Sequence, residues 1–156
     1  MLFLRTCFHI CLQSCVAVLV VYSGLDIVKA QSKKPILIST PTSTRAIALD
    51  AATLTSEPFF AKSSFFGYGS DKSNTIILFA VNLSLKIGDD GNAVTASAED
   101  VAHRQYALKV EYVGKVPGQE WLTQLNLGLD KDMGDVGDVL IRIAYQGVNS
   151  NRVRVG

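Results

Sequence analysis

Apolar and polar residues alternate with period two along most of the chain after residue 105. In the run 138–145 the large apolar residues fall on every second position, and Arg142 lies between two of them. Such alternation is typical of antiparallel strands that pack one face on a core. We therefore expect Ile141 and Val110 to be core positions, and Arg142 and Lys109 to lie outside the core. The shared faces are Leu108, Val110 and Tyr112; Thr123, Leu125, Leu127 and Leu129; Val139, Ile141, Ile143 and Tyr145; and Val153 and Val155.

The earlier part of the chain predicts further strands. Thr75–Leu83 is an almost continuous apolar run, which favours a central strand buried on both faces. Shorter candidates lie at 36–38, 45–49 and 93–98, and turn-forming residues separate them. No stretch has a sustained helical stripe. Seven or eight short strands in one chain of this length predict an all-β fold, an antiparallel β-sandwich. Trp121 opens its strand after the Pro117-Gly118 turn, and we expect it to be packed.

The first thirty residues have the pattern of a secretory signal peptide. A short basic start precedes an apolar block at 10–25, and Val28-Lys29-Ala30 provides small residues at the cleavage positions. We expect a signal-peptide helix at 1–30, an extended leader at 31–44 and one sandwich domain at 45–156. All three cysteines precede residue 31, so the exported chain would contain none. The localisation predicted is secreted or periplasmic, with no membrane attachment after cleavage.

Two other interpretations of the N-terminal segment stay open. The apolar block could remain as an anchor, although its ~16 residues fall short of the ~20 that a spanning helix needs. Alternatively, Leu12-Gln13-Ser14-Cys15 faintly resembles a lipoprotein cleavage box. Cleavage there would leave an apolar N-terminus, because Val16–Val21 follows directly.

The charge of the chain limits its partners. It has 15 basic and 14 acidic residues, for a net charge of +1. A nucleic-acid-binding domain gains affinity from a basic surface that releases counterions, and recruitment to an anionic membrane needs a similar field. The charge balance therefore argues against a nucleic acid and against an anionic membrane surface as partners. The expected partner is a protein or a glycan.

Several segments resemble an uncharacterised immunoglobulin-like C-terminal domain that recurs in large secreted bacterial proteins. The matching segments are Ile77–Leu83, Val110–Gly118, Leu122–Asn126, Gly137–Ile143 and Gly147–Asn151. One departure is Asn82, which stands where the family has a glycine in the turn after its central strand. The resemblance implies an immunoglobulin-like fold in an exported bacterial protein, and it brings no catalytic residues.

Two polar segments are candidates for chemistry. Asp130–Asp138 has four carboxylates in nine residues, but its spacing is not that of a calcium loop, because Ile141 stands where the bidentate glutamate would be needed. Asp100 and His103 could approach across a turn as an acid–base pair. We expect ordinary polar loops in both places, with no cofactor and no metal, because neither cysteine nor a second histidine is available in the exported chain.

The segment 59–68 is unusually aromatic. Phe65, Phe66 and Tyr68 are the candidate partner-binding residues, since exposed aromatic rings give a large contact area at low entropy cost. The alternative is that these rings cover an open end of the sandwich, and the sequence favours that alternative.

The sequence as a whole predicts an exported module without catalytic activity. Its expected role is interaction or structure at the cell exterior. A small secreted hydrolase is the rival interpretation, but the chain lacks a Gly-x-Ser-x-Gly nucleophile motif. A third interpretation is a C-terminal fragment of a larger secreted protein.

Overall fold

The fold is all-β and antiparallel in the part of the chain that the structure describes. The computed structural model describes residues 33–61, 74–134 and 136–156, so the predicted signal-peptide helix lies outside it. None of the described residues forms a helix with the length and hydropathy needed to cross a membrane. Two 3-10 turns, η2 (Gly91–Ala93) and η3 (Lys131–Met133), interrupt the strands. The strands are β1 (Ile36–Leu37), β2 (Ala48–Asp50), β3 (Thr75–Val81), β4 (Val94–Glu99), β5 (Gln105–Val116), β6 (Gln119–Gly128), β7 (Val139–Tyr145), β8 (Val148–Asn149) and β9 (Val153–Val155).

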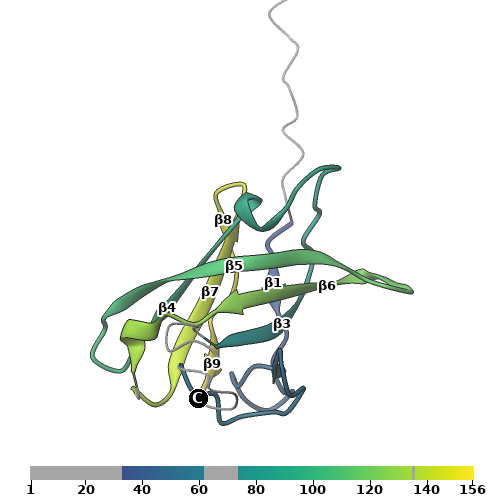
Figure 1. Cartoon of the computed structure of the whole chain (residues 1–156). Helices are drawn as coiled ribbons and strands as arrows, with labels where there is room; N and C mark the ends of the chain where they lie inside the picture. The colour runs from purple at the N-terminus through teal and green to yellow at the C-terminus, as the bar shows by residue number, and fades with distance from the viewer. Residues whose placement is uncertain (1–32, 62–73, 135) are drawn as a thin grey trace, which may run out of the picture. The chain divides into compact units, whose positions relative to one another are not determined.

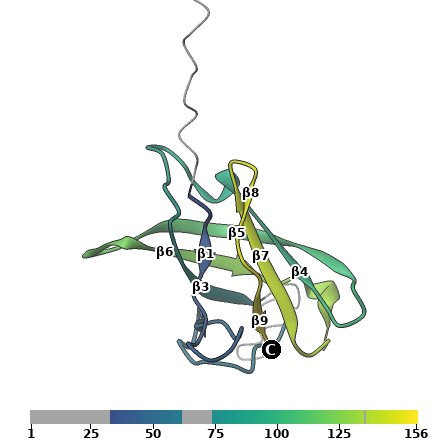
Figure 2. The same ribbon diagram turned by 180° about the vertical axis from the view of Figure 1, so that it is seen from behind.

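These nine strands form one curled sheet. Its order is β1-β3-β6-β5-β4-β7-β8, with β2 also paired to β3 and β9 also paired to β7. Strand β5 produces the curl, because its first residues pair with β4 and the remainder pairs with β6. As a result β5 and β6 pass in front of β7 in Figure 1, and β7 and β9 lie in front in Figure 2. The two-residue β8 is the strand that the alternation pattern does not predict.

The edge of β9 is joined to the segment before β2. The backbone N–H of Ala46 donates to the carbonyl oxygen of Arg154 at 2.8 Å, and the N–H of Arg154 donates to the carbonyl oxygen of Thr44 at 2.7 Å. On β1, the amide of Asn151 bonds to both backbone groups of Leu37, at 2.7 Å and 3.0 Å. A side chain thus occupies the place of a neighbouring strand, and the backbone groups of β1 are satisfied.

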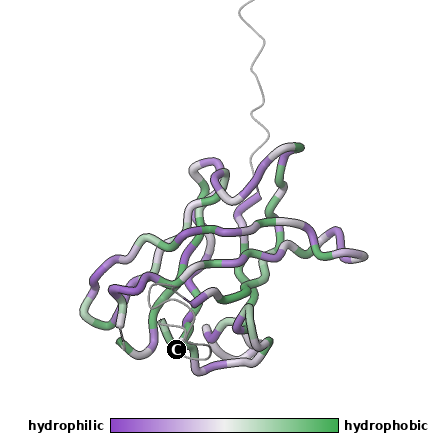
Figure 3. Tube along the Cα trace, in the orientation of Figure 1, coloured by the Kyte–Doolittle hydropathy of each residue, from purple (hydrophilic) through white to green (hydrophobic). Residues whose placement is uncertain are grey.

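The core lies inside the curl, and the alternation predicts most of it. Ile141 and Ile143 are 0% exposed, whereas Arg142 between them is half-buried. The predicted faces of β6, β7 and β9 are buried throughout. The continuous apolar run of β3 predicts burial on both faces, and this is confirmed only in part: the core side is buried, whereas on the other side Ile77 is buried and Phe79 and Val81 are half-buried. In Figure 3 the hydrophobic colour follows β3, while hydrophilic stretches recur along β5 and β6.

The prediction for β5 is wrong after Val110. The register with β6 shifts between Val110 and Tyr112, which leaves Glu111 as an extra residue in a β-bulge. Because a shift of one residue moves the following side chains to the other face, Val113 is buried while Tyr112 is 46% exposed. Val110 is half-buried and packs against the core, as its predicted inward face requires.

The prediction for Trp121 is also wrong, since its side chain is 60% exposed. The last pair between β3 and β6 is Val81 with Leu122. Beyond that pair the hairpin of β5 and β6 extends past the end of β3, as Figures 1 and 2 show. Trp121 therefore lies beyond the part of β6 that pairs with β3. Its indole N–H donates to Oε1 of Gln119 at 2.7 Å.

Asn82 adopts a backbone conformation that glycine adopts easily. Its φ is 60°, in the left-handed region that favours glycine. Asparagine is among the residues that tolerate this region best. The turn after β3 therefore keeps the backbone that a glycine would allow.

Candidate functional site

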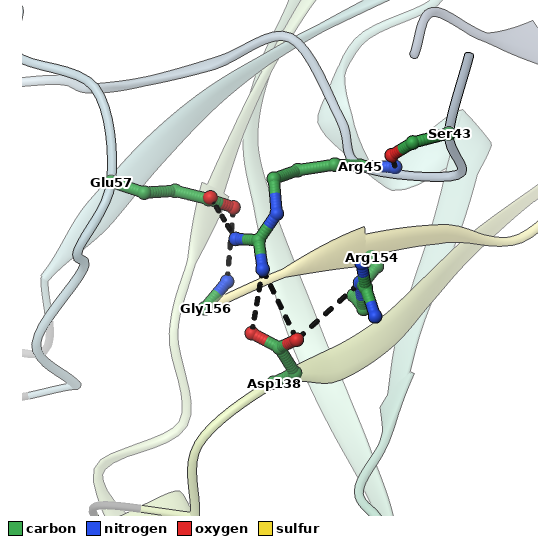
Figure 4. Close-up of polar contacts among 6 residues, drawn as sticks. All are labelled: Ser43, Arg45, Glu57, Asp138, Arg154 and Gly156. Atoms are coloured by element: carbon green, nitrogen blue, oxygen red, sulfur yellow. Dashed lines mark hydrogen bonds and ion pairs between the residues drawn. The ribbon is translucent and has the colours of Figure 1, made fainter. Parts of the chain in front are cut away.

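Four charged side chains gather at the junction of β9 with the segment before β2. Figure 4 shows Arg45 between two carboxylates: one of its amino groups contacts Glu57, and the other contacts both oxygens of Asp138 at 3.2 Å. Arg154 contacts Asp138 from β9, with Nε 3.3 Å from Oδ2. Asp138 thus bonds to two guanidinium groups, and its charge is balanced within the cluster. We call these four residues the Arg45 cluster.

The fold brings the Arg45 cluster together from distant parts of the sequence. Arg45 and Arg154 are paired across the bridge that joins the sheet edges, and Asp138 directly precedes β7. Glu57 is placed by two backbone contacts, since its Oε1 accepts from the N–H of Gly156 at 3.0 Å and the N–H of Phe59 donates to the carbonyl oxygen of Gly156 at 3.0 Å. The hydrogen bond to Glu57 is the main reason that the pKa of Arg45 is raised above its usual value.

An apolar hollow lies beside the Arg45 cluster. Its volume is about 230 Å³, which is slightly below the ~300–1,000 Å³ of most small-molecule sites. Phe59 and Met133 belong to its wall, and Asp138 and Gly156 give it a polar rim. The hollow can hold a small apolar group, but the carboxylate at its rim is already committed to two arginines. The remaining lining residues are Pro58, Phe60, Ala61, Leu129, Gly134, Val136, Gly137, Val139 and Val155.

The aspartates of 130–138 lie in separate local structures. Asp130 caps η3, where Oδ1 accepts from the backbone N–H of Asp132 at 2.9 Å. Asp138 belongs instead to the Arg45 cluster, and Asp135 lies outside the described residues. Within 33–61, 74–134 and 136–156, no group of three or more histidine, cysteine or acidic side chains is arranged to hold a metal ion.

Asp100 and His103 do not form the acid–base pair that their spacing allows. Asp100 is 4% exposed and accepts from the backbone N–H groups of Ala102 and Arg104, both at 2.9 Å. Its other oxygen accepts from Nε of Arg104 at 2.6 Å and from the hydroxyl of Tyr106 at 3.0 Å. His103 is exposed, and its Nδ1 lies 2.9 Å from Oε1 of Glu99. A turn of positive φ at His103 separates the two side chains.

The candidate partner-binding residues Phe65, Phe66 and Tyr68 lie outside the described residues. The residues before them reach the hollow: Phe59 is half-buried and packs against the core, whereas Phe60 is 64% exposed. The backbone N–H of Asn74 donates to the carbonyl oxygen of Ala61 at 3.1 Å. Ala61 and Asn74, the described residues on either side of segment 62–73, are therefore adjacent, and Ala61 lines the hollow.

The sequence does not reveal the Arg45 cluster. Neither Arg45 nor Glu57 lies in a recognisable sequence motif. Arg45 and Glu57 are 12 residues apart in the sequence, and Arg45 and Asp138 are 93 apart. A weak signal exists in β9, where Arg154 alternates with Val153 and Val155 and is therefore expected outside the core. Long-range pairing of this kind depends on the closure of the sheet, which periodicity does not specify.

Comparisons with protein-family models, with curated proteins and with solved structures found no match for this chain. Its function is therefore inferred from its own geometry.

The acidic hydrogen-bond networks predict a loss of stability in acid. Burial raises the pKa of Asp50 and of Asp100, but hydrogen bonds from neighbouring donors outweigh it, so the pKa of each is lowered. The pKa of Asp89 is lowered mainly by the hydrogen bond from Tyr145, and that of Glu99 mainly by the hydrogen bond from His103. A carboxyl whose pKa is lower in the folded state stabilises that state above its unfolded pKa. We expect the free energy of unfolding, measured by urea titration, to fall as the pH drops below about 4. A free energy that stayed constant down to pH 2 would contradict these pKa directions.

Proposed function

We propose that this chain is an exported, non-catalytic module of bacterial origin, an immunoglobulin-like β-sandwich with an interaction or structural role at the cell exterior. The signal-peptide pattern at 1–30 supports export. The curled antiparallel sheet, in which β5 and β6 lie across β7, supports a sandwich with β5 shared by its two layers. Its partner is a protein or a glycan.

One observation carries the non-catalytic part of the proposal. Asp138, the acid at the rim of the hollow, has two arginines on its carboxylate. A general base needs a carboxylate that is free to take a proton from a substrate, and a nucleophile needs a base within hydrogen-bond reach. The Arg45 cluster satisfies neither requirement and instead ties β7, β9 and the segments around β2 to one another.

Two experiments test this function against its rivals. The exported protein is first assayed on chromogenic ester, glycoside and peptide substrates, and we expect no turnover above that of the heat-denatured protein. Turnover that follows the folded protein would favour the small hydrolase. Sequencing of the neighbouring reading frame tests whether the chain is a fragment of a larger secreted protein.

Partner capture tests the interaction role and the aromatic candidates. We expect the wild-type chain, immobilised and incubated with envelope extract or a glycan array, to retain a ligand. The double variant Phe65→Ser with Phe66→Ser is compared by thermal melting. If the rings bind the partner, capture is lost and the melting curve is unchanged; if they cover the core, the melting temperature falls. Retention of neither protein nor glycan by a folded chain would argue against an interaction role.

A further inference from the structure

The outward side of β3, β6 and β5 is apolar and uncharged along most of β3, and charged side chains lie on it only at its Thr75 end. The core side of β3 is occupied by Ile76, Leu78 and Ala80, so the alternate residues of this strand face outward. The pairing register then places their neighbours in rows across the sheet. We call this surface the outer face. It comprises Ile36, Ile38, Ile47, Leu49, Ile77, Phe79, Val81, Tyr112, Gly114, Leu122, Gln124 and Asn126.

The outer face has the composition of the centre of a protein interface. Such centres are depleted in charged residues and enriched in aromatic ones, whereas 19% of the whole chain is charged and none of the outer face is. Three of its apolar side chains are strongly exposed, namely Ile36 at 42%, Ile47 at 45% and Tyr112 at 46%. Charge begins in the next row, Thr75–Gly128–Lys109, where Lys109 and Glu111 lie beside Gly128 and Glu111 accepts from the hydroxyl of Thr75 at 2.9 Å.

The middle of the outer face carries two amides. Nε2 of Gln124 donates to Oδ1 of Asn126 at 2.8 Å. This bond uses one donor and one acceptor, so Oε1 of Gln124 still accepts and Nδ2 of Asn126 still donates. The phenol of Tyr112 lies over Gly114, two residues further along the same strand, because a β-carbon added to Gly114 would clash with the Tyr112 hydroxyl. The aromatic ring therefore covers exposed backbone and extends the apolar surface.

We propose that the outer face binds the outer face of a second copy of this chain in a two-fold symmetric dimer. This inference rests on the proposed interaction role and names the partner. In a two-fold pair the same patch meets itself, so the patch must be self-complementary. The outer face meets this condition, because it brings no like charges together. Across the two-fold axis, the amide of Asn126 in one copy can donate to Oε1 of Gln124 in the other, and the reverse pair forms by symmetry.

A glycan fits this surface less well than a second copy does. A sugar offers many hydroxyl groups, whereas the outer face offers two amides among nine apolar side chains. A second copy covers those side chains with equally apolar ones. The face has twelve residues, fewer than the ~20–30 per partner of a standard interface, so we expect a weak dimer that depends on concentration.

Analytical ultracentrifugation tests the dimer. The full chain is expressed with its own leader, purified from the exported fraction, and measured from about 1 µM to about 1 mM, the range of weak affinities. We expect the molar mass to rise from that of a monomer to that of a dimer. Ile47→Glu and Tyr112→Glu, each at an exposed position of the face, should weaken the dimer by more than about tenfold, since each buries an unpaired carboxylate. Ile87→Glu is the matched control, because Ile87 is fully exposed in the loop after β3, and it should leave the affinity unchanged.

Cross-linking locates the interface independently of those variants. In a chain whose Cys7, Cys11 and Cys15 are replaced by serine, Gln124→Cys should form an intermolecular disulfide under mild oxidation, whereas Ile87→Cys should not. A wild-type chain that stays monomeric to 1 mM overturns the proposal, as does a dimer that both glutamate variants leave intact or a disulfide that forms equally at position 87. If the chain proved monomeric, the proposed function would still stand, because export and the absence of turnover are measured in separate experiments. Turnover of a chromogenic substrate by the folded protein would overturn the proposed function, whatever the oligomeric state.

Discussion

Truncation of Ile141 to alanine should lower the free energy of unfolding by about 2–5 kcal/mol, the range for large-to-small changes in a packed core. Ile141 is 0% exposed and lies in the middle of β7, between Ala98 of β4 and Val153 of β9. Because strands hold it on both sides, the backbone has little freedom to close the space left by the missing atoms. Urea unfolding of both proteins, compared at constant slope, measures the difference.

Arg142→Ala is the control for that experiment. Arg142 is the next residue of the same strand and is only half-buried, on the face away from the core. Changes at such surface positions usually stay within about 0.5 kcal/mol. If Arg142→Ala proved more costly than Ile141→Ala, the register of β7 would be shifted by one residue, and Asp138 would leave the Arg45 cluster.

Strand β7 shows how far periodicity predicts this fold. Its apolar alternation gives its buried face and its last residue, and misses its first by one, because the strand is paired on both sides and packed on one. Strand β5 shows where the method fails. The bulge at Glu111 breaks the period of two, and the sequence contains no glycine or proline that marks it. The prediction for Trp121 is wrong for another reason. Its exposure depends on where β3 ends, and that is a property of a different strand.

The candidate site was less accessible to prediction than the fold. Asp138 and Asp130 appear in the sequence as one acidic loop, yet they serve an ion-pair cluster and a turn cap respectively. Arg45 and Glu57 have no signature, since their roles follow from the bridge between Arg45 and Arg154 that joins the sheet edges. The alternation of apolar residues predicts part of the outer face. Tyr112 belongs to that face only because of the β-bulge at Glu111, which the alternation does not predict.

A common feature links these sites. Where the short strands leave a sheet edge unpaired, side chains rather than further strands make the connecting hydrogen bonds and ion pairs. The amide of Asn151 satisfies β1, and the Arg45 cluster joins β9 to the segments around β2. Chains without disulfides must obtain their stability from packing and hydrogen bonds, and no cysteine follows Cys15. The polar networks are therefore part of the framework of the fold.

The turn between β4 and β5 provides the second large effect. Asp100→Ala should lower the free energy of unfolding by about 2–3 kcal/mol, because hydrogen bonds to a charged group are worth about 1.5–3 kcal/mol and part of the loss is recovered by water at exposed Arg104. The carboxylate accepts two backbone N–H groups that close the turn, and it accepts the hydroxyl of Tyr106. Urea unfolding at pH 7 measures the loss.

Asp132→Ala is the matched control for Asp100→Ala, since Asp132 is an exposed acid in η3 and should change stability by less than about 0.5 kcal/mol. A second readout separates the charge of Asp100 from its packing. The hydrogen bonds that lower its pKa stabilise the folded state above the unfolded pKa, and this contribution disappears as the pH falls through the folded pKa. The variant lacks the contribution at every pH, so its stability should fall less steeply than that of the wild type below about pH 4. Parallel curves for the two proteins would mean that the carboxylate of Asp100 is not held ionised by the turn, and that its effect is one of packing alone.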